Sequence, residues 1–330
     1  MSNVIASLAP FLGPPVGSPT NGNVKYRCPF HKGGKESSPA FYVHVATGLA
    51  FCHACAKGWA LPQVLKKLGA HAWQITAASK EIGPYEKKKK KTYAESITSF
   101  LPEELTGVLG GQCPNDLLED GFSKDILREA EVGWDPHHSV PVYMIRDHLG
   151  RLRMVSGRFS DGYFFYGAKQ LQPFFFEDTQ YERPEKSDFL WNFHTLYPAL
   201  FKGAGAENII VVEGFKACLW LVQNGYPNTV ALMGSYLSDE QATLLERVAT
   251  TVIVFLDLDT AGKSGTIRAV ERLKSTSRVR VASYPQENQK ELLRDSHRPD
   301  EWGGKIQPDY LTKEGLDAAL NTSKPYWRLR

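Results

Sequence analysis

The stretch VIVFLDLDTAGKSG, residues 252–265, decides the fold. An apolar run leads into Asp257 and Asp259, and the chain then turns at Ala261-Gly262. Residues 206–285 around it alternate between strand and helix patterns in the order β-α-β-α-β-α-β, which is typical of a parallel sheet covered on both faces. The expected strands are ENIIVVEG, NTVALMG, TTVIVFLD and RVRVASYP, and the expected helices are FKACLWLVQNG, SDEQATLLERVA and GKSGTIRAVERLK.

Acidic residues stand at the ends of two of these strands. Asp257 and Asp259 have a spacing that points both side chains the same way, and Glu213 follows a neighbouring strand. In an open α/β sheet, ligands bind at the carboxyl ends of the strands. Carboxylates in one crevice repel each other unless cations join them, and an all-oxygen ligand set favours Mg²⁺ or Mn²⁺. The sequence therefore predicts a catalytic Mg²⁺ or Mn²⁺ site on Glu213, Asp257 and Asp259.

Other interpretations of the stretch fail when its positions are counted. A Walker A loop needs glycine five positions before Gly262, where Asp257 stands. An EF-hand needs ligands at its fifth and twelfth positions, which here are Ala261 and Arg268. A phosphatase of the aspartyl-phosphate type has threonine at the position of Ala261. Helix capping by aspartate explains one member of the pair, but not both members together with Glu213.

A second cluster lies near the start of the chain. Cys28-x2-His31 and Cys52-x2-Cys55 are two close pairs around a hairpin-sized spacer. They supply three thiolates and one imidazole, a tetrahedral set with no open position, so we predict a structural zinc ion. His44 and His53 are the alternatives for the fourth ligand. An odd cysteine count argues against disulfides, and the two remaining cysteines, Cys113 and Cys218, are expected to be reduced thiols.

Residues 1–70 are predicted as the zinc-binding module. AFYVHV and GLAFCH alternate as the strands of a hairpin, and LPQVLKKLG has the signals of a short helix. A module of this size has a small core, so zinc would supply much of its stability. Its interleaved basic and aromatic residues suit either single-stranded nucleic acid or the module's own core. They are Tyr26, Arg27, Lys32, Lys35, Phe41, Tyr42, Lys57 and Trp59.

Composition divides the rest of the chain. Residues 71–98 hold the lysine run EKKKKK and little apolar periodicity, so we predict a solvated, flexible linker; contact with phosphates is a second, compatible interpretation of the lysines. Residues 99–205 combine a helix pattern, LLEDGFSKDILREAEVGW, with alternating strands and are predicted as an α+β subdomain. Residues 286–330 form a C-terminal segment with a basic, aromatic tail.

Charge is unevenly distributed along the chain. Net charge is +3, but residues 1–99 carry 13 Lys and Arg against 4 Glu, so the remainder is acidic overall. A basic N-terminal part suggests nucleic acid as a partner. No apolar run approaches the roughly 20 residues of a membrane span, and the N-terminus lacks the features of a signal peptide. We therefore expect no membrane association and a cytoplasmic location.

Two motifs resemble a known family. Glu213-Gly214 after an apolar strand, with Asp257-x-Asp259-x-Ala261-Gly262, is similar to the Toprim domain of bacterial-type primases, topoisomerases and some nucleases. CPFH, SSPAFYV and Cys-x2-Cys resemble the zinc module of DnaG-like and phage primases. The resemblance covers nearly the whole chain and follows the primase order. It implies a multidomain α/β protein: a small zinc-ribbon module, a linker, the mixed α+β subdomain and a Toprim domain at residues 206–285.

The resemblance also implies further site residues. The family's third acidic motif, Asp-Pro-Asp, is matched by QPDYLTKEG with Asp309, although Gln307 replaces the first aspartate. Asp300 in RPDEW is the alternative to Asp309 as a magnesium ligand. The segment SGRFSDGYFFYGAK is similar to the family's Gly-Arg motif and downstream lysine. This motif implies that Arg158 and Lys169 contact template or nucleotide, and Lys263, just after the acidic pair, is expected to meet phosphate. The alternative for each of the three is an exposed, solvated side chain.

The expected function is that of a DNA-dependent RNA primase encoded by a phage or mobile element, and acting in the host cytoplasm. Its expected partners are a single-stranded DNA template, ribonucleoside triphosphates and, because no Walker A motif is present, a separate replicative helicase. A Toprim nuclease would use the same metal site. A topoisomerase would need a strand-passage domain, for which the chain leaves little room. A catalytically inert DNA-binding replication or repair factor is the third alternative, favoured by Gln307.

Overall fold

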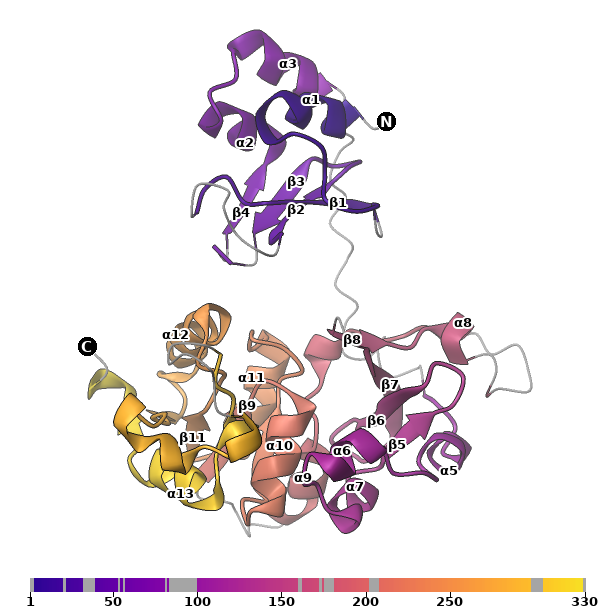
Figure 1. The fold of residues 1–330 in the computed structure, drawn as a ribbon, viewed down its shortest axis with the longest axis vertical. Helices are drawn as coiled ribbons and strands as arrows, with labels where there is room; N and C mark the ends of the chain where they lie inside the picture. Colours follow the sequence, from indigo (N-terminus) through magenta and orange to yellow (C-terminus); the bar gives the residue numbers. More distant parts are fainter. Residues whose placement is uncertain are drawn as a thin grey trace. The chain divides into compact units, whose positions relative to one another are not determined.

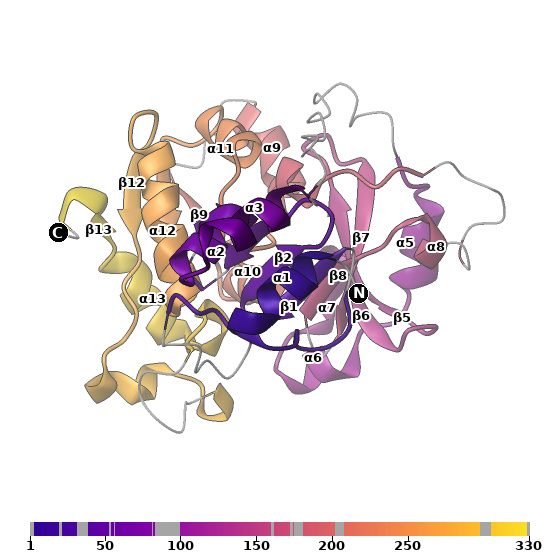
Figure 2. The same cartoon turned by 90° about the horizontal axis from the view of Figure 1, so that it is seen from above.

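The protein divides into two compact units, Met1–Lys90 and Lys91–Arg330, and each is described by itself (Figures 1 and 2). The structure is a computed structural model. The residues that it describes are 3–19, 22–31, 39–52, 54–55, 57–80, 82, 100–159, 162–171, 174, 181–201, 208–297 and 305–328.

Unit 1 contains a four-stranded antiparallel sheet in the order β1-β2-β3-β4. β2 and β3 form the predicted hairpin, in which Phe41 pairs with Cys52. The predicted helix at LPQVLKKLG is also present and contributes Leu61 and Val64 to the core. The strands are β1 Asn23–Tyr26, β2 Phe41–His44, β3 Leu49–Cys52 and β4 Lys57–Ala60, and the helices are α1 Asn3–Leu12, α2 Leu61–Lys67 and α3 Ala72–Lys80.

Helix α3 lies in the segment that the sequence predicts as linker. It packs beside α2, and Ala78 is buried in the core of unit 1. The predicted linker start at residue 71 was therefore wrong for residues 72–80. Because Ala78 is the one fully buried residue of this helix, its sequence has no apolar stripe that a periodicity search would detect. The lysine run at residues 86–91 lies outside the described residues.

The first part of unit 2 is an antiparallel sheet in the order β5-β6-β7-β8 with short helices around it. Its predicted turn after β6 is held by Asp147, whose Oδ1 accepts from the backbone N–H of Leu149 at 3.0 Å and of Arg151 at 3.1 Å. The strands are β5 Val132–Asp135, β6 Val140–Arg146, β7 Leu152–Phe159 and β8 Gly162–Phe165, and the helices are α5 Glu104–Leu109, α6 Asn115–Glu119, α7 Lys124–Glu129, α8 Ala168–Leu171, η3 Lys186–Asp188 and α9 Phe193–Phe201.

The second part of unit 2 is a five-stranded sheet in the order β10-β9-β11-β12-β13. Its first four strands are parallel, as predicted, and β13 adds an antiparallel edge. The strands are β9 Asn208–Val212, β10 Thr229–Ala231, β11 Thr251–Val254, β12 Arg278–Val281 and β13 Lys324–Pro325. The helices are α10 Phe215–Gln223, α11 Asp239–Glu246, α12 Thr260–Leu273, η4 Glu287–Leu292, η5 Asp295–His297, η6 Pro308–Tyr310, α13 Lys313–Asn321 and η7 Tyr326–Arg328.

Helices cover both faces of this sheet, which explains its continuous apolar strands. Ile210 and Ile253 pack with α10 and α13 on one face. Val211 and Val252 point to the other face, where they pack with α11 and α12. Alternate residues of β9 and β11 are thus buried on opposite sides, and the centres of these two strands hold only apolar residues.

An aromatic cluster joins the two sheets of unit 2 into one core. The ring of Tyr143 on β6 stacks on Phe215 of α10, with centroids 4.4 Å apart. Trp191 meets both rings edge-on and donates from Nε1 to the carbonyl of Met144 at 2.8 Å. The predicted boundary between residues 205 and 206 therefore separates two sheets that share a hydrophobic core.

Candidate functional site

The predicted carboxylates gather at the carboxyl edge of the parallel sheet. Glu213 follows β9, and Asp257 and Asp259 follow β11, the neighbouring parallel strand. Burial, with the charges of Asp257 and Asp259, raises the pKa of Glu213 to about 8. Burial also raises the pKa of Asp309 to about 6; the charge of Asp257 adds to this shift, and Lys216 opposes it. The four acids therefore share one electrostatic environment.

Gly262 allows the chain to turn tightly beside these acids. Asp259 is the N-cap of α12, and its Oδ1 accepts from the Gly262 N–H at 2.8 Å. A Cβ at Gly262 would lie 2.0 Å from the carbonyl oxygen of Asp257 and 2.8 Å from Oε1 of Glu213. The backbone can approach the carboxylates this closely only because residue 262 is glycine.

A lysine that the sequence analysis did not single out lies between the two aspartates. Lys305 Nζ is 2.9 Å from Oδ2 of Asp257 and 3.6 Å from Oδ2 of Asp259. One cation thus contacts both carboxylates, which confirms that their side chains face the same side. Although burial lowers the pKa of Lys305, these acidic neighbours raise it overall. The lysine is half-exposed, whereas Asp257 is 7% exposed.

The donor set fits a divalent metal ion. Oε1 of Glu213 and Oδ1 of Asp309 are buried and have no hydrogen-bond partner among the described residues. A buried carboxylate oxygen without a partner is costly, and a bound cation would remove that cost. All the donors are carboxylate oxygens, which Mg²⁺ and Mn²⁺ prefer.

Asp309 belongs to a network of charges that fixes the QPD segment. Its Oδ2 lies 4.0 Å from Nζ of Lys216, and its backbone carbonyl accepts from Arg294 at 2.9 Å. Lys216 and Arg294 both pair with Asp120, beside α6. The alternative ligand, Asp300, lies outside the described residues.

Of the predicted basic residues, Arg158 contacts a tyrosine that is also affected by the charges of the acids. Its guanidinium packs over the ring of Tyr163, 4.6 Å from the ring centroid. Burial raises the pKa of Tyr163 to about 12; Arg158 opposes this shift, while Asp309 and Asp257 add to it. Lys263 is exposed on the first turn of α12 and makes no ion pair with a described residue. The side chain of Lys169 lies outside the described part of the chain.

The four predicted zinc ligands come together in unit 1. The ligand atoms of Cys28, His31, Cys52 and Cys55 all lie within 4.8 Å of one another. Sγ of Cys28 and Sγ of Cys55 are 3.7 Å apart, close to the separation of about 3.8 Å that tetrahedral Zn–S bonds of about 2.3 Å produce. Nδ1 is the imidazole atom that faces the thiols, 3.3 Å from Sγ of Cys55.

The other histidines and cysteines have different surroundings. His44 Nδ1 lies 3.0 Å from the Thr47 hydroxyl, in the turn after β2, and takes no part in the cluster. His53 lies outside the described residues. Cys113 and Cys218 are free thiols, as expected, and the buried Cys218 donates to the carbonyl of Thr229.

The structure separates the aromatic residues of unit 1 into two groups. Tyr26 and Phe41 are buried, and Trp59 packs against Phe30 in the core. Tyr42 lies on the other face of the sheet with Phe51, which is 40% exposed and which the sequence analysis did not name. These two rings, together with one side of Trp59, line a hollow of about 840 Å³. The period-two alternation of exposed and buried residues in β3 would have identified Phe51 from the sequence.

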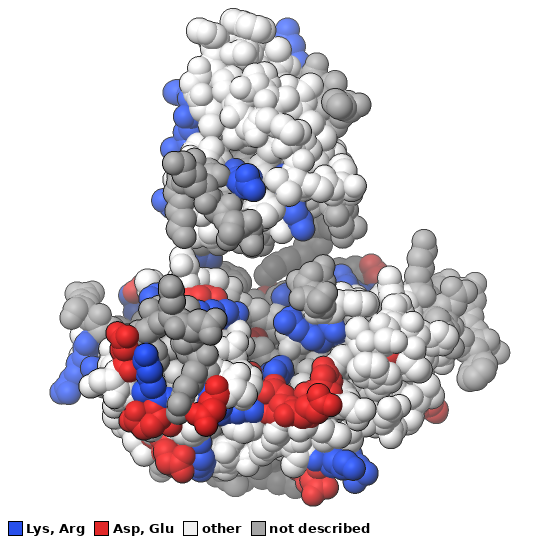
Figure 3. All heavy atoms as spheres, in the orientation of Figure 1, with Lys and Arg blue, Asp and Glu red and all other residues white. Residues whose placement is uncertain are grey.

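A lysine lies over one of the rings that line this hollow. Lys25 Nζ lies over the ring of Tyr42, 5.5 Å from its centroid. The described residues of unit 1 include no aspartate or glutamate, and Figure 3 shows Lys and Arg but no acidic side chain on the visible face of this unit. Cations beside exposed rings are the features that bind single-stranded nucleic acid.

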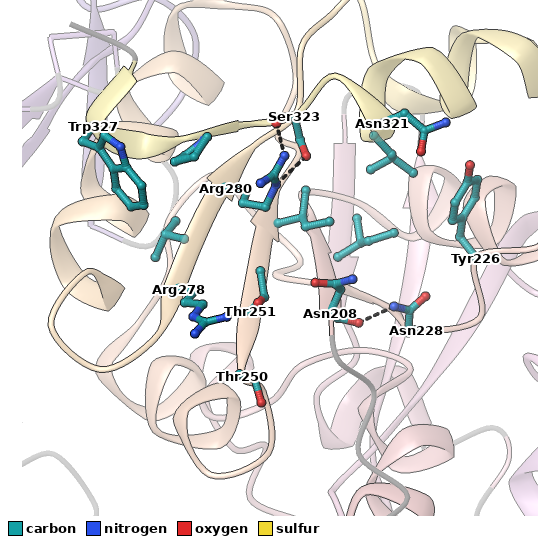
Figure 4. Close-up of a pocket in the computed structure, with 15 residues that line it drawn as sticks. Asn208, Tyr226, Asn228, Thr250, Thr251, Arg278, Arg280, Asn321, Ser323 and Trp327 are labelled. Carbon is teal, nitrogen blue, oxygen red and sulfur yellow. Dashed lines mark hydrogen bonds between the residues drawn. The ribbon is translucent and has the colours of Figure 1, made fainter.

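A further cavity, of about 790 Å³, lies at the amino ends of the parallel strands (Figure 4). It is lined by Asn208, Thr251 and Arg278, from the starts of β9, β11 and β12, and Arg280 is tied there to Ser323. No carboxylate lines it. It is at the opposite edge of the sheet from Glu213 and Asp257, so it is separate from the acidic site.

Comparisons with known proteins agree with this geometry. Residues 207–283 match the family model described as a Toprim domain. The chain is 27% identical over 311 residues to a DNA primase of Deinococcus radiodurans, covering 80% of this chain and 52% of that protein. Its sequence is thus similar to those of DnaG-type DNA primases. A DNA primase of Geobacillus stearothermophilus is 25% identical over 317 residues, covering 78% of this chain and 50% of that protein. The chain thus spans about half the length of these curated relatives.

A solved structure shows the same fold. The crystal structure of the zinc-binding and RNA polymerase domains of the Aquifex aeolicus primase matches with a TM-score of 0.52 and 17% identity, covering 99% of this chain and 84% of that one. The predicted fold class, a zinc-binding module followed by α/β domains with a mainly parallel Toprim sheet, is thereby confirmed. None of the helices in the described part of the chain has the length and apolar character that crossing a bilayer requires.

Proposed function

We propose that this protein is a DNA-dependent RNA primase that synthesises short oligoribonucleotides on single-stranded DNA by metal-dependent nucleotidyl transfer. The observation that carries the proposal is that one chain contains both the carboxylate cluster and a Cys3His zinc-binding module. In the carboxylate cluster, Oε1 of Glu213 and Oδ1 of Asp309 have no hydrogen-bond partner among the described residues. The similarity to DNA primases supports it. Ribonucleoside triphosphates are the proposed substrates, and a separate replicative helicase is the proposed partner.

The chain's residues have distinct roles in this reaction. Glu213, Asp257, Asp259 and Asp309 would hold Mg²⁺ or Mn²⁺. Bound there, the ion would neutralise the triphosphate and favour deprotonation of the attacking 3′-hydroxyl. Glu213 would also accept that proton, and pyrophosphate would leave as the new phosphodiester bond forms. The basic residues Arg158, Lys169 and Lys263 would contact phosphates of the template or the nucleotide.

Unit 1 would hold the template strand. Its zinc ligands fix the loops at one end of the sheet, and Tyr42 and Phe51 present rings on the exposed face for stacking with bases. Lys25 beside Tyr42 offers a charge to the DNA backbone. In this role the zinc-binding module biases the start site without contacting the reacting atoms.

Two other functions use parts of the same structure. A Toprim nuclease would have the same carboxylates, but the zinc-binding module with its exposed rings favours a protein that holds a template. Two buried carboxylate oxygens without hydrogen-bond partners lower the stability of the fold. In an inert DNA-binding factor no bound metal ion would offset this loss, so the cluster argues against that function.

A primer-synthesis assay tests the proposal. Purified protein is incubated with single-stranded DNA of mixed sequence, labelled ribonucleoside triphosphates and Mg²⁺. Asp257→Asn should abolish product while zinc content and melting temperature stay near those of the wild type. Asp125→Asn, the same change at an exposed position in α7, is the matched control and should retain synthesis.

The possible outcomes distinguish a primase, a nuclease and an inert DNA-binding factor. Short labelled oligoribonucleotides that Asp257→Asn eliminates support a primase. Metal-dependent cutting of the DNA would identify a nuclease. Binding of intact DNA without any product, also in the presence of a helicase, would favour the inert factor.

A further inference from the structure

The cavity at the amino ends of the parallel strands has no part in the proposed reaction. Its volume is about 790 Å³, and residues of β9, β11, β12 and β13 line it. Asn228, which directly precedes β10, lies at one end, and Trp327, which follows β13, lies at the other (Figure 4). The cavity thus extends across all five strands of the sheet. Neighbouring strands are about 4.8 Å apart, so it is a groove about 19 Å long.

Three polar side chains form a row on the floor of this groove. Thr251 on β11 is in register with Asn208 on β9 and with Arg278 on β12. Figure 4 shows the hydroxyl, amide and guanidinium of these residues side by side. None of the three side chains makes a hydrogen bond or an ion pair with a described residue. Arg280, further along β12, donates to Ser323, so Arg278 carries the guanidinium that is open to a ligand.

The charges of the groove favour an anionic ligand. None of the described residues that line it is acidic. Asp317 lies near the end opposite Trp327, where it accepts from the hydroxyl of Tyr226 and pairs with Lys313. A carboxylate on a ligand would therefore meet the forked N–H donors of Arg278 without repulsion from the lining residues.

Apolar residues supply the rest of the contact surface. Ile210 and Ile253 continue the floor from Asn208 and Thr251 toward the centre of the sheet, and Leu320 of α13 forms a wall. The ring of Trp327 is 60% exposed. An apolar side chain next to the carboxylate of a ligand would cover this ring and remove it from water.

The lining favours a peptide over a nucleic acid. The amides of Asn208 and Asn321 make no hydrogen bond with a described residue, and each has donors and an acceptor for the N–H and C=O groups of an extended main chain. A single-stranded nucleic acid needs cations along its whole path and rings for successive bases. Here Arg278 and Trp327 lie at the same end, and amides and apolar residues occupy the remainder.

We propose that this groove binds an extended, acidic segment of a partner protein, with a carboxylate on Arg278 and an apolar side chain against Trp327. An extended chain advances about 3.3 Å per residue, so the groove holds about six residues. The inference goes beyond the proposed function, because no residue of the groove belongs to the carboxylate site. Glu213 and Asp257 lie at the opposite edge of the sheet, so a bound segment leaves them uncovered.

Selection from a random-peptide phage library tests the proposal. The full chain is the bait, and Arg278→Glu is the bait for counter-selection. The wild type should enrich sequences in which Asp or Glu stands next to an apolar residue. The most enriched sequence is then synthesised with a fluorescent label, in its own form and with each acidic residue replaced by Lys, and both peptides are titrated by anisotropy.

Arg278→Gln should weaken binding of the acidic peptide about tenfold, the loss expected for one charge-assisted contact. Asn208→Asp, which replaces an amide by a carboxylate of the same shape, should weaken it as well. Arg278→Glu should reverse the preference and bind the Lys peptide more tightly than the acidic one. Arg128→Gln, the same change at an exposed position in α7, is the matched control and should bind like the wild type. Melting temperatures show that each variant is folded.

Two results would overturn the proposal: enriched sequences that lack acidic residues, and binding of the acidic peptide that Arg278→Gln leaves unchanged. A labelled single-stranded oligodeoxynucleotide is titrated into the same variants. If Arg278→Gln weakened its binding and left peptide binding intact, the groove would belong to a nucleic acid instead.

Primer synthesis keeps this proposal apart from the primase assignment. Without peptide, Arg278→Gln should synthesise primers like the wild type, because the groove lies outside the carboxylate site. Synthesis by the wild type without selection of acidic peptides would overturn the groove and leave the primase assignment standing. Binding of an acidic peptide that depends on Arg278 would support the groove even if no primers were made.

Discussion

At the scale of single residues, Lys305 already provides a cation to the acidic cluster. Its ammonium contacts Asp257 and Asp259 on the side that a metal ion would use. A divalent ion held by the same carboxylate oxygens would have to displace this ammonium, which would then be available to a phosphate. Lys305 offsets part of the repulsion between carboxylates when no metal is bound.

Lys305→Met should increase affinity for Mn²⁺ about fivefold, corresponding to the roughly 1 kcal/mol of a partly exposed ion pair. It should also lower the melting temperature of the metal-free protein, because the carboxylates lose their counter-ion. Calorimetric titration with Mn²⁺ and thermal melting measure both effects. Lys274→Met, which removes an equally charged side chain paired with Glu271 near the far end of α12, is the control. If Lys305→Met bound Mn²⁺ more weakly than the wild type, the metal ion would not displace the Lys305 ammonium.

Gly262→Ala should destabilise the protein by about 1–3 kcal/mol and weaken Mn²⁺ binding, because the new methyl group meets Asp257 and Glu213. Gly107→Ala is the control, and it is expected to change stability in the opposite direction. Gly107 lies inside α5 with open space around it, so this change should add about 0.5–1 kcal/mol of stability. Denaturant unfolding measures both. If Gly262→Ala left the free energy of unfolding unchanged, the turn after β11 would be able to shift to accommodate the methyl group.

The acidic residues were predictable from sequence, whereas their neighbours were not. Glu213, Asp257 and Asp259 follow apolar strands, and the geometry of a parallel sheet brings such strand ends together. Lys305 and Tyr163 meet them only through tertiary packing across long separations in the chain. No local pattern marks such residues.

At the scale of elements, amphipathic patterns decided what the sequence revealed. Strands β9, β11 and β12 and helices α10, α11 and α12 were predictable, because each buries a regular set of apolar residues. Helix α3 has one fully buried residue and gave no such signal. The zinc ligands were predictable because two close pairs around a hairpin suffice to specify a tetrahedral site.

Cys52→Ser should reduce zinc from about one equivalent to near zero and unfold unit 1, because β3 loses the ligand at its end. Elemental analysis and circular dichroism of the purified variant measure this. Cys113→Ser is the matched control, because Cys113 lies in unit 2 and outside the cluster. Retained zinc in Cys52→Ser would require a different ligand set.

At the scale of the whole molecule, the two compact units have separate cores, and each carries its own candidate metal site. The zinc ligands belong to unit 1, and the carboxylates belong to unit 2. Their stabilities should therefore respond independently to removal or addition of metal.

Calorimetry should resolve two transitions. A chelator selective for zinc should abolish the transition of unit 1 and leave that of unit 2 in place. Mn²⁺ at 100 times its dissociation constant should stabilise unit 2 by about 2.7 kcal/mol and leave unit 1 unchanged. A single transition that moves with both treatments would contradict independent units.

The aromatic cluster of Tyr143, Trp191 and Phe215 limits how this chain can be recombined with others. A gene fragment that begins at residue 206 would encode every strand of the parallel sheet, but it would leave the ring of Phe215 without its partners. The uncovered apolar surface would favour aggregation. We therefore expect that the Toprim sheet of this protein folds stably only together with the antiparallel sheet that precedes it.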